Sequence, residues 1–248
     1  EFRMVGSAAS IAGPNVILNA IVAEALEEFA DKLEAAADFD AAVVELVRET
    51  IIAHKRIIFN GDGYTDAWVE EAKSRGLLNL KSTPEALPYM VKEKNIILFV
   101  KHGIFTEAEV RSRLEISLEN YSKAIRIEAL AMLDMLFKDI LPAAALYTAD
   151  LTAAAKSKKE LGIAGSFETE LASKIATLSS LLYTDAEKLK AGLGDVVKTS
   201  AQAEADYYHD VILKDMGALR EAGDELEKLM GGKYLPYPTY SELLFGVY

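Results

Sequence analysis

The sequence predicts a mainly α-helical fold of long antiparallel helical hairpins or a bundle, preceded by a short N-terminal strand. Three observations lead to this fold class. Apolar residues recur at helical spacing through most of the 248 residues. Short stretches containing glycine separate the long helical patterns, which is typical of helices that turn back on one another. Strand patterns are almost missing, since they are limited to residues 1–5 and, weakly, to residues 95–100.

The first part of the chain begins with the candidate strand "EFRMV", followed by the small-residue turn "GSAASIAGP". Asn15 is predicted to cap the first helix, because an asparagine side chain can accept a free backbone N–H of a first turn. A second helix is expected over residues 40–58, and turn residues follow at 60–63. The first helix carries an apolar stripe opposite its acidic side chains, formed by Ile17, Ile21, Ala25 and Phe29.

Start and stop signals define three further helices. Thr65 is predicted to cap a short helix that stops at Gly76. Pro84 is expected at a first helical position, directly after Thr83. Thr106 and Glu109 have the spacing of a capping box, in which each side chain accepts from the backbone N–H of the other residue. Residues 95–100 between these signals could form either a strand or a helix.

The second half of the chain consists of long helical stripes. We expect Pro142 to end or kink the helix that begins near Thr106, because proline lacks the backbone N–H of a helix interior. All the apolar stripes are expected to form the core. Their members are Val110, Leu114, Leu118, Tyr121 and Ile125, then Phe167, Leu171, Ile175, Leu178, Leu182 and Leu189, then Tyr208, Ile212, Met216, Leu219, Gly223, Leu226 and Met230.

The composition excludes several classes of protein. Hydrophobic residues make up 51% of the chain, which is ample for one or two packed domains and argues against disorder. Cysteine is absent, so disulfides and thiolate metal sites are excluded. The net charge of −12 makes nucleic acid a poor partner. No apolar run is long enough to span a membrane, and no signal peptide is predicted. The absence of cysteine fits the reducing cytoplasm, which is the location expected.

The opening strand carries a possible catalytic pair. Side chains alternate between the faces of a strand, so Glu1 and Arg3 share one face while Phe2 and Met4 share the other. A carboxylate can hold a hard cation such as Mg²⁺, and a guanidinium can bind phosphate or carboxylate oxygens. Together they suit phosphoryl transfer. The same pair is also common as a plain surface ion pair, and a leading Glu-Phe can be a cloning remnant.

Four segments of the chain resemble glutamine synthetases, and three of them resemble the type III branch of that family. The opening, "EFRMVGSAASIAGPNVILNAIVAEAL", is similar to the family's last active-site segment. The segments "HKRIIFNGDGYTDAWVEEAKSRGLLNLKSTPEALP" and "EKNIILFVKHGIFTEAEVRSRLEISLENYSKAIRIEA", with the ending "YLPYPTYSELLF", are similar to type III. The resemblance covers residues 1–140 and residues from about 206 to 248.

The resemblance implies an ATP-dependent ligase that joins ammonia to glutamate through γ-glutamyl phosphate. Glu1 matches the family's metal-ligand carboxylate. Arg3 matches the arginine that meets the glutamate substrate and the transferred phosphate, and it is the catalytic residue expected here. The implied cofactors of the full enzyme are ATP and Mg²⁺ or Mn²⁺, and its implied assembly is a ring-based homo-oligomer. No nucleotide-contacting residue can be assigned.

The resemblance also implies that this chain is the C-terminal part of a longer enzyme. We expect residues 1–140 to belong to the catalytic domain and residues 141–248 to form a helical C-terminal region with an extended tail. The isolated chain is then expected to be inactive and, with apolar surface left uncovered, to self-associate. The alternative is a stand-alone helical scaffold or interaction module without catalysis.

The remaining candidate residues favour structural roles. His54, His102 and His209 form no helical metal-ligand pair, and His209 is expected in a surface network with Asp206 and Asp210. Lys55 and Arg56 lie at the C-terminal end of a predicted helix, where the helix dipole favours cations. A place near the nucleotide or a subunit contact is the second interpretation. Trp68 and the aromatic residues of the tail are expected to be packing anchors. Pro236 and Pro238 predict an extended tail that can latch onto a neighbouring domain or subunit.

Overall fold

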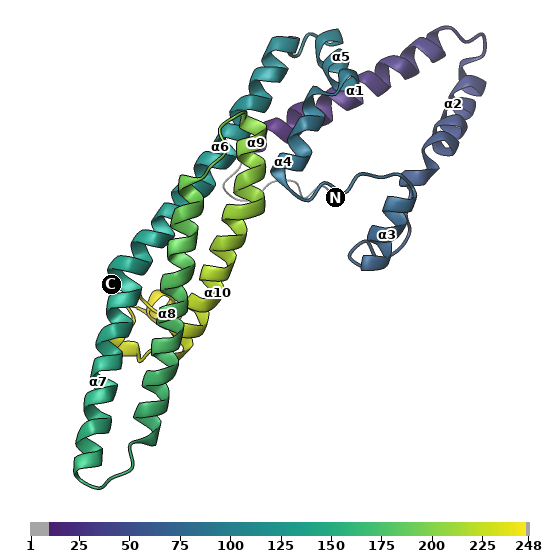
Figure 1. Ribbon diagram of the computed structural model, residues 1–248. Coiled ribbons are helices and arrows are strands. Elements are labelled where there is room, and N and C mark those ends of the chain that lie inside the picture. The colour runs from purple at the N-terminus through teal and green to yellow at the C-terminus, as the bar shows by residue number, and fades with distance from the viewer. Residues whose placement is uncertain (1–9, 247–248) are drawn as a thin grey trace. The chain divides into compact units, whose positions relative to one another are not determined.

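The computed structural model describes residues 10–246, and these residues form helices joined by short loops, with no strand among them (Figure 1). The strand predicted over residues 1–5, with Glu1 and Arg3, lies outside the described residues. The mainly α-helical class is therefore confirmed. Residues 95–100, which could have been a strand, lie in a helix.

The chain divides into two compact units, one up to Ile116 and one from Ser117 onward. The boundary expected at residue 140 concerns the domains of a longer enzyme. The division of this chain into units does not test it, so it stays a prediction. Unit 1 contains α1 (Ala12–Glu34), α2 (Phe39–His54), the 3-10 turn η1 (Lys55–Ile57), α3 (Asp66–Ser74), α4 (Thr83–Ala86), the 3-10 turn η2 (Leu87–Val91), α5 (Glu93–Lys101) and the start of α6 (Glu107–Met135).

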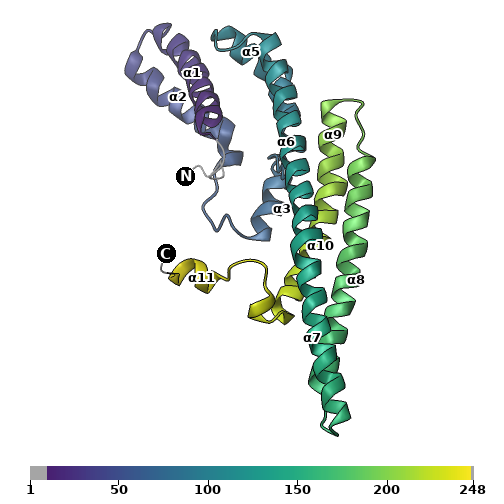
Figure 2. The ribbon, with the colours of Figure 1, turned by 90° about the vertical axis from the view of Figure 1, so that its left-hand side faces the viewer.

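Unit 2 continues α6 and adds the other helices. These are the π-helical turn η3 (Leu136–Ile140), α7 (Leu141–Glu160), α8 (Ser166–Gly194), α9 (Ala201–Tyr207), the π-helical turn η4 (Tyr208–Ile212), α10 (Leu213–Leu229), the 3-10 turn η5 (Gly232–Tyr234) and α11 (Tyr240–Phe245). Helices α7, α8 and α10 lie side by side in both views, as the expected antiparallel hairpins (Figures 1 and 2).

The core of unit 2 runs along these hairpins. The predicted stripes on α8 and α10 supply many of its buried side chains, including Ile175, Leu182, Leu189, Leu219 and Leu226. Phe167, which was expected in the same stripe, is 66% exposed because it lies in the first turn of α8, next to the hairpin loop. The helical period therefore predicted the buried face correctly, except at this helix end.

Pro142 does not end the helical backbone, because α7 follows η3 directly, so the expected end at this proline is wrong. The alternative, a kink at Pro142, stays a prediction. In η3 the N–H of Leu141 donates to the carbonyl of Leu136, five residues earlier, so the helix is locally widened. A proline in a regular α-helix clashes with the carbonyl four residues before it. A π-helical turn directly before the proline relieves this clash, and α7 continues with Pro142 in its first turn.

Two predicted helix starts also differ from the structure. Asn15 does not cap α1, because the helix begins earlier and the N–H of Asn15 already donates to the carbonyl of Ile11. The cap of α4 is Ser82, which forms a capping box with Glu85, and Pro84 is the second helical residue. The caps at Thr65 and Thr106 are confirmed by hydrogen bonds from the N–H groups of Trp68 and Glu109.

The C-terminal tail leaves α10 and docks on unit 2 itself. The Tyr234 ring stacks on Tyr147 with ring centres 4.5 Å apart, and its hydroxyl donates to Asp150. The hydroxyl of Tyr237 donates to Asp139 at 3.3 Å. Tyr234 and Tyr237 are therefore anchors, as expected, and they dock on the chain's own unit. The expectation is wrong for Tyr240, which is 84% exposed. Within the described residues, no helix is both long enough and apolar enough to cross a lipid bilayer.

Candidate functional site

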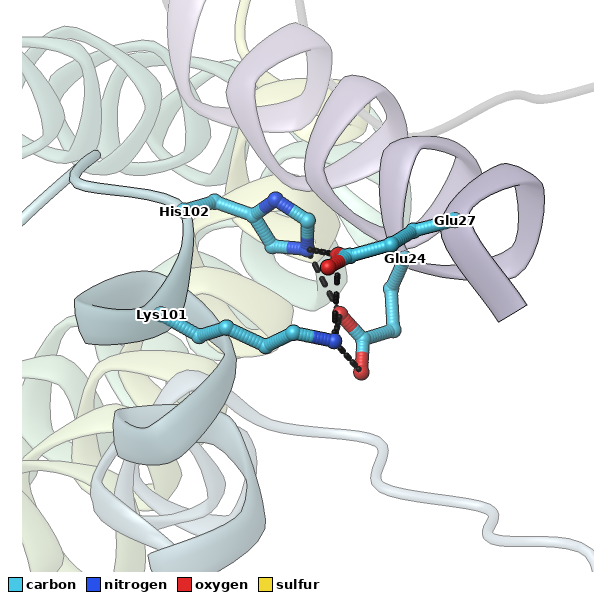
Figure 3. Close-up of polar contacts among 4 residues, drawn as sticks. All are labelled: Glu24, Glu27, Lys101 and His102. Carbon is cyan, nitrogen blue, oxygen red and sulfur yellow. Dashed lines mark hydrogen bonds and ion pairs between the residues drawn. The ribbon is translucent and has the colours of Figure 1, made fainter. Parts of the chain in front are cut away.

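The two residues assigned to catalysis and metal binding, Arg3 and Glu1, lie outside the described residues, so their geometry is not part of the structure. Within residues 10–246, one group of side chains has the composition of a possible metal site. It consists of Glu24 and Glu27 on α1 and His102 directly after α5, with Lys101 beside them (Figure 3).

The small core of unit 1 brings α1 against α5. Phe99 of α5 and Val110 of α6 are buried together with Ala20 of α1, which is 1% exposed. A residue as small as alanine lets the two helix backbones approach each other. Glu24 and Glu27 follow Ala20 at helical spacing, so the same face of α1 carries both carboxylates toward the end of α5.

The end of α5 is fixed by its backbone. Gly103 has φ +63°, a left-handed conformation in which glycine has no steric penalty. The N–H of Ile104 donates to the carbonyl of Phe99 at 2.9 Å, which is the hydrogen bond of a glycine-terminated helix end. Lys101 and His102 therefore stand at the helix C-terminus, where the helix dipole favours positive charge.

The four side chains form a compact polar network (Figure 3). Lys101 Nζ lies 3.0 Å and 2.9 Å from the two carboxylate oxygens of Glu24, and 3.0 Å from Glu27 Oε2. His102 Nε2 lies 2.6 Å from Glu24 Oε2 and 3.6 Å from Glu27 Oε2. We call this network of Glu24, Glu27, Lys101 and His102 the α1–α5 clamp.

The clamp favours the charged forms of Glu24 and Lys101. Hydrogen bonds from Lys101 and then from His102 hold the pKa of Glu24 below its ordinary value. Hydrogen bonds to Glu24 and then to Glu27 raise the pKa of Lys101. Lys101 and Glu24 are therefore ionised through the physiological range, and each stabilises the charge of the other.

The donor set resembles a site for a divalent metal. The ligand atoms of Glu24, Glu27 and His102 all lie within 4.8 Å of one another, and oxygen and imidazole donors suit Zn²⁺. However, the ammonium group of Lys101 is already within 3.0 Å of both carboxylates. It supplies the positive charge that a metal would bring. The geometry therefore fits an ion-pair clamp that joins α1 to α5 better than it fits a metal centre.

A second polar surface in unit 1 follows α2. Side chains of Lys55, Arg56 and Arg75 line a hollow together with isoleucines. Arg75 fixes the loop, because its Nη1 donates to the carbonyls of Arg56 at 3.1 Å and Ile58 at 3.0 Å. Lys55 and Arg56 are exposed. A role of Lys55 and Arg56 near a nucleotide or a subunit contact stays a prediction.

The other residues that the sequence marked are structural. The Trp68 ring stacks on Phe59 with ring centres 3.9 Å apart, as a packing anchor. His209 Nδ1 lies 3.0 Å from Asp210 Oδ1 at the surface, so the Asp210 contact of the expected network is present. Glu24 and Glu27 were missed as partners of His102 and of Lys101. Nothing local could reveal them, since Glu24 and His102 are 78 residues apart in the sequence.

Comparison with known proteins gives the chain a family context. Residues 42–159 match the family model of the glutamine synthetase C-terminal domain. The chain is 44% identical to a glutamine synthetase of Butyrivibrio fibrisolvens over 215 residues, which cover 83% of this chain and 30% of that protein. It is 34% identical to a type-3 glutamine synthetase of Dictyostelium discoideum over 257 aligned positions, covering 99% of this chain and 35% of that protein.

A third relative, a glutamine synthetase of Bacteroides fragilis, is 30% identical over 259 aligned positions, which again cover 99% of this chain and 35% of the relative. The chain therefore spans about a third of the length of the curated relatives that it matches.

Proposed function

Because the chain belongs to the glutamine synthetase family, with a type-3 enzyme among its relatives, we propose that it is the C-terminal part of a glutamate–ammonia ligase. The whole enzyme would join ammonia to glutamate, with ATP forming γ-glutamyl phosphate as the activated intermediate. One observation carries this proposal: the alignment with the Dictyostelium discoideum type-3 enzyme extends over 99% of the chain.

The proposed contribution of this chain to catalysis comes from its first residues. The carboxylate of Glu1 would hold Mg²⁺ or Mn²⁺, because carboxylate oxygens are preferred ligands of such hard cations. The bound metal would neutralise phosphate charge during transfer. The guanidinium of Arg3 would bind oxygens of glutamate and of the transferred phosphate, using its planar set of N–H donors. The remaining ligands and the ATP site would come from upstream parts of the enzyme.

The helices would provide contacts within a ring-based homo-oligomer in the cytoplasm. Exposed apolar side chains in unit 1 support this part of the proposal. On α2, Val44, Val47 and Ile51 are 70%, 53% and 52% exposed and follow one another at helical spacing. Such an apolar stripe is typical of a surface that is covered in an assembly.

A stand-alone helical scaffold without catalysis is the second candidate. It is favoured by unit 2, whose buried core is continuous and formed entirely by its own helices. This candidate requires no upstream residues and no catalysis. It therefore predicts that the complete encoded protein forms no glutamine, whereas the ligase proposal predicts that it does.

The test compares glutamine formation by this chain and by the complete encoded protein, with glutamate, ammonia, ATP and Mg²⁺. We expect activity only in the complete protein. In that protein, Arg3→Lys is expected to lower kcat by roughly 100-fold, since the lysine loses the bidentate geometry at the transferred group. The exposed Arg48→Lys serves as a matched control with unchanged activity. Activity of the chain alone, or an unaffected Arg3→Lys enzyme, would contradict the proposal.

A further inference from the structure

Unit 2 contains a pocket of about 470 Å³ that none of the preceding assignments uses. Its walls come from α6, η3, α8 and α10, and the tail residues Leu235–Tyr237 form one side. This volume lies in the range of sites that hold small organic ligands. The hydrogen bond from Tyr237 to Asp139 and the stacking of Tyr234 on Tyr147 hold the tail segment in place.

Methionine side chains are concentrated in the apolar lining, which they share with five leucines and Ile140. The chain contains six methionines, and four of them face this pocket: Met132, Met135, Met216 and Met230. Methionine is flexible and polarisable, and it is frequent at surfaces that adapt to different apolar ligands. A core that needed only a fixed shape would use branched side chains with fewer rotamers. The concentration of methionine in one pocket therefore points to a ligand with an apolar body.

The charged residues around the pocket are mostly acidic. Arg220 Nε is paired with Asp224 at 2.6 Å, so these two charges neutralise each other. The carboxylates of Glu128 and Glu227 also line the pocket and are exposed. Neither has a basic partner among residues 10–246. The pocket thus combines an apolar interior with two uncompensated negative charges.

We propose that this pocket binds a small ligand with an apolar chain or ring and one positively charged group, such as a primary aliphatic amine. The apolar body would lie among the methionines, and the ammonium group would reach Glu128 or Glu227. Burial of the apolar body supplies most of the affinity, because removing apolar area from water contributes more free energy than an exposed ion pair. The carboxylates supply the preference for a cation.

Helix α11 of a second copy of the chain would be a less suitable occupant of this pocket than the amine. Its sequence, YSELLF, has apolar side chains but its one charged residue is Glu242. An acidic helix does not complement an acidic rim. The concentration dependence of the experiment below separates this occupant from the amine.

The experiment uses the chain labelled with ¹³C at the methionine methyl groups and titrated with octylammonium. We expect the signals of Met132, Met135, Met216 and Met230 to shift together, while Met90 in unit 1 stays unchanged. Octanoate has a chain of similar length and the opposite charge. It should bind about 5-fold or more weakly, as expected for the loss of one or two exposed ion pairs.

Two variants complete the test. Replacing both Glu128→Gln and Glu227→Gln should make the affinities for octylammonium and octanoate nearly equal. Gly223→Leu should fill the pocket and weaken binding by at least about tenfold. A Cβ at position 223 meets nothing nearer than Leu182 Cδ2 at 4.0 Å, so the fold should tolerate it; circular dichroism checks this.

Three results would overturn the proposal: no shift with octylammonium, equal or tighter binding of octanoate, or a shift of Met90 together with the four pocket methionines. A fourth result would assign the pocket to α11 of a second copy. In that case the signals of the pocket methionines change with protein concentration in the absence of ligand, and deletion of residues 240–248 abolishes this change.

Discussion

The two units bury apolar surface to different extents. The described core of unit 2 joins buried residues from α6, α7, α8 and α10 along most of the hairpins. The described core of unit 1 has three buried members, Ala20, Phe99 and Val110, with partly buried side chains around them. Meanwhile α1 and α2 expose large apolar residues, including Leu26, Phe39 and Val44 at 60–70%.

This difference shows how each unit is stabilised. Unit 2 has enough buried area to be stable by itself, because apolar burial is the main favourable contribution to folding. The buried carboxylate of Asp215 pairs with Lys188 at 2.7 Å and links α10 to α8 at an already packed interface. In unit 1 the α1–α5 clamp supplements a very small core. We infer that unit 1 depends on a partner surface for part of its stability, in agreement with the proposed larger enzyme.

The largest effect is expected from Phe99→Ala in unit 1. Phe99 is 6% exposed and contacts the Phe105 ring with centres 5.4 Å apart. Removing a buried phenyl ring costs about 3–5 kcal/mol. Unit 1 has little other core to compensate, so α1 and α5 should lose their protection from hydrogen exchange while α8 and α10 keep theirs. Equal loss in both units would show that they unfold together.

The matching change in unit 2 is Leu189→Ala. Leu189 is fully buried, and its truncation costs about 2–5 kcal/mol. Because the core of unit 2 is large, we expect it to stay folded with a lower denaturation midpoint and to lose no helical signal under native conditions. Urea unfolding followed by circular dichroism measures this shift. Native-state unfolding of α8 would contradict the assignment of unit 2 as the stable unit.

The sequence predicted unit 2 better than unit 1, for a physical reason. Long helices that pack only on each other carry a regular apolar stripe, and the period therefore identified Ile175, Leu182 and Leu189 as core. The π-helical turn before Pro142 was not predictable, because it is a backbone adjustment that leaves the apolar period nearly unchanged. In unit 1 the apolar residues of α1 and α2 predicted helices correctly but not burial, since many of them stay exposed.

The candidate site was less accessible to sequence reasoning. The resemblance assigned Glu1 and Arg3, which lie outside the described residues. His102 was recognised as a titratable residue without a helical partner. Its partners Glu24 and Glu27 come from another helix, and only the packing of Ala20 against Phe99 brings them together. Long-range pairing of this kind leaves no pattern in a single sequence.

A smaller effect is expected from the exposed stripe on α2. We predict that the isolated chain self-associates, and that the triple variant Val44→Gln, Val47→Gln and Ile51→Gln weakens this association by about tenfold or more, because it removes apolar area from the contact. Glutamine is a good helix former, so α2 should persist. Sedimentation velocity over a range of concentrations measures the change.

The control for the α2 stripe is Leu146→Gln on α7, where a single exposed leucine should matter little. A parent chain that stays monomeric at every concentration would disprove the prediction, and so would a triple variant that associates as strongly as the parent.

The smallest effect is expected from the α1–α5 clamp, because its side chains are partly exposed and water screens their charges. The pKa of Glu24 is lower in the folded chain than its ordinary value of 4.5. The carboxylate therefore contributes stability that is fully present above pH 4.5 and is lost as the pH falls through the lower, folded value. The pKa of Lys101 is raised above 10.5, so its contribution is present below pH 10.5 and is lost as the pH rises further.

Comparison of three chains across this pH range isolates the clamp. Glu24→Gln should reduce the protection of α1 and α5 from hydrogen exchange at neutral pH and flatten its dependence on acid. Glu28→Gln changes a neighbouring exposed carboxylate that has no basic partner in the described part of the chain, so it should behave as the parent. Unit 2 should be unaffected in all three. If Glu24→Gln and Glu28→Gln have the same acid profile, the ion pair and hydrogen bonds of Glu24 add nothing to the stability of unit 1.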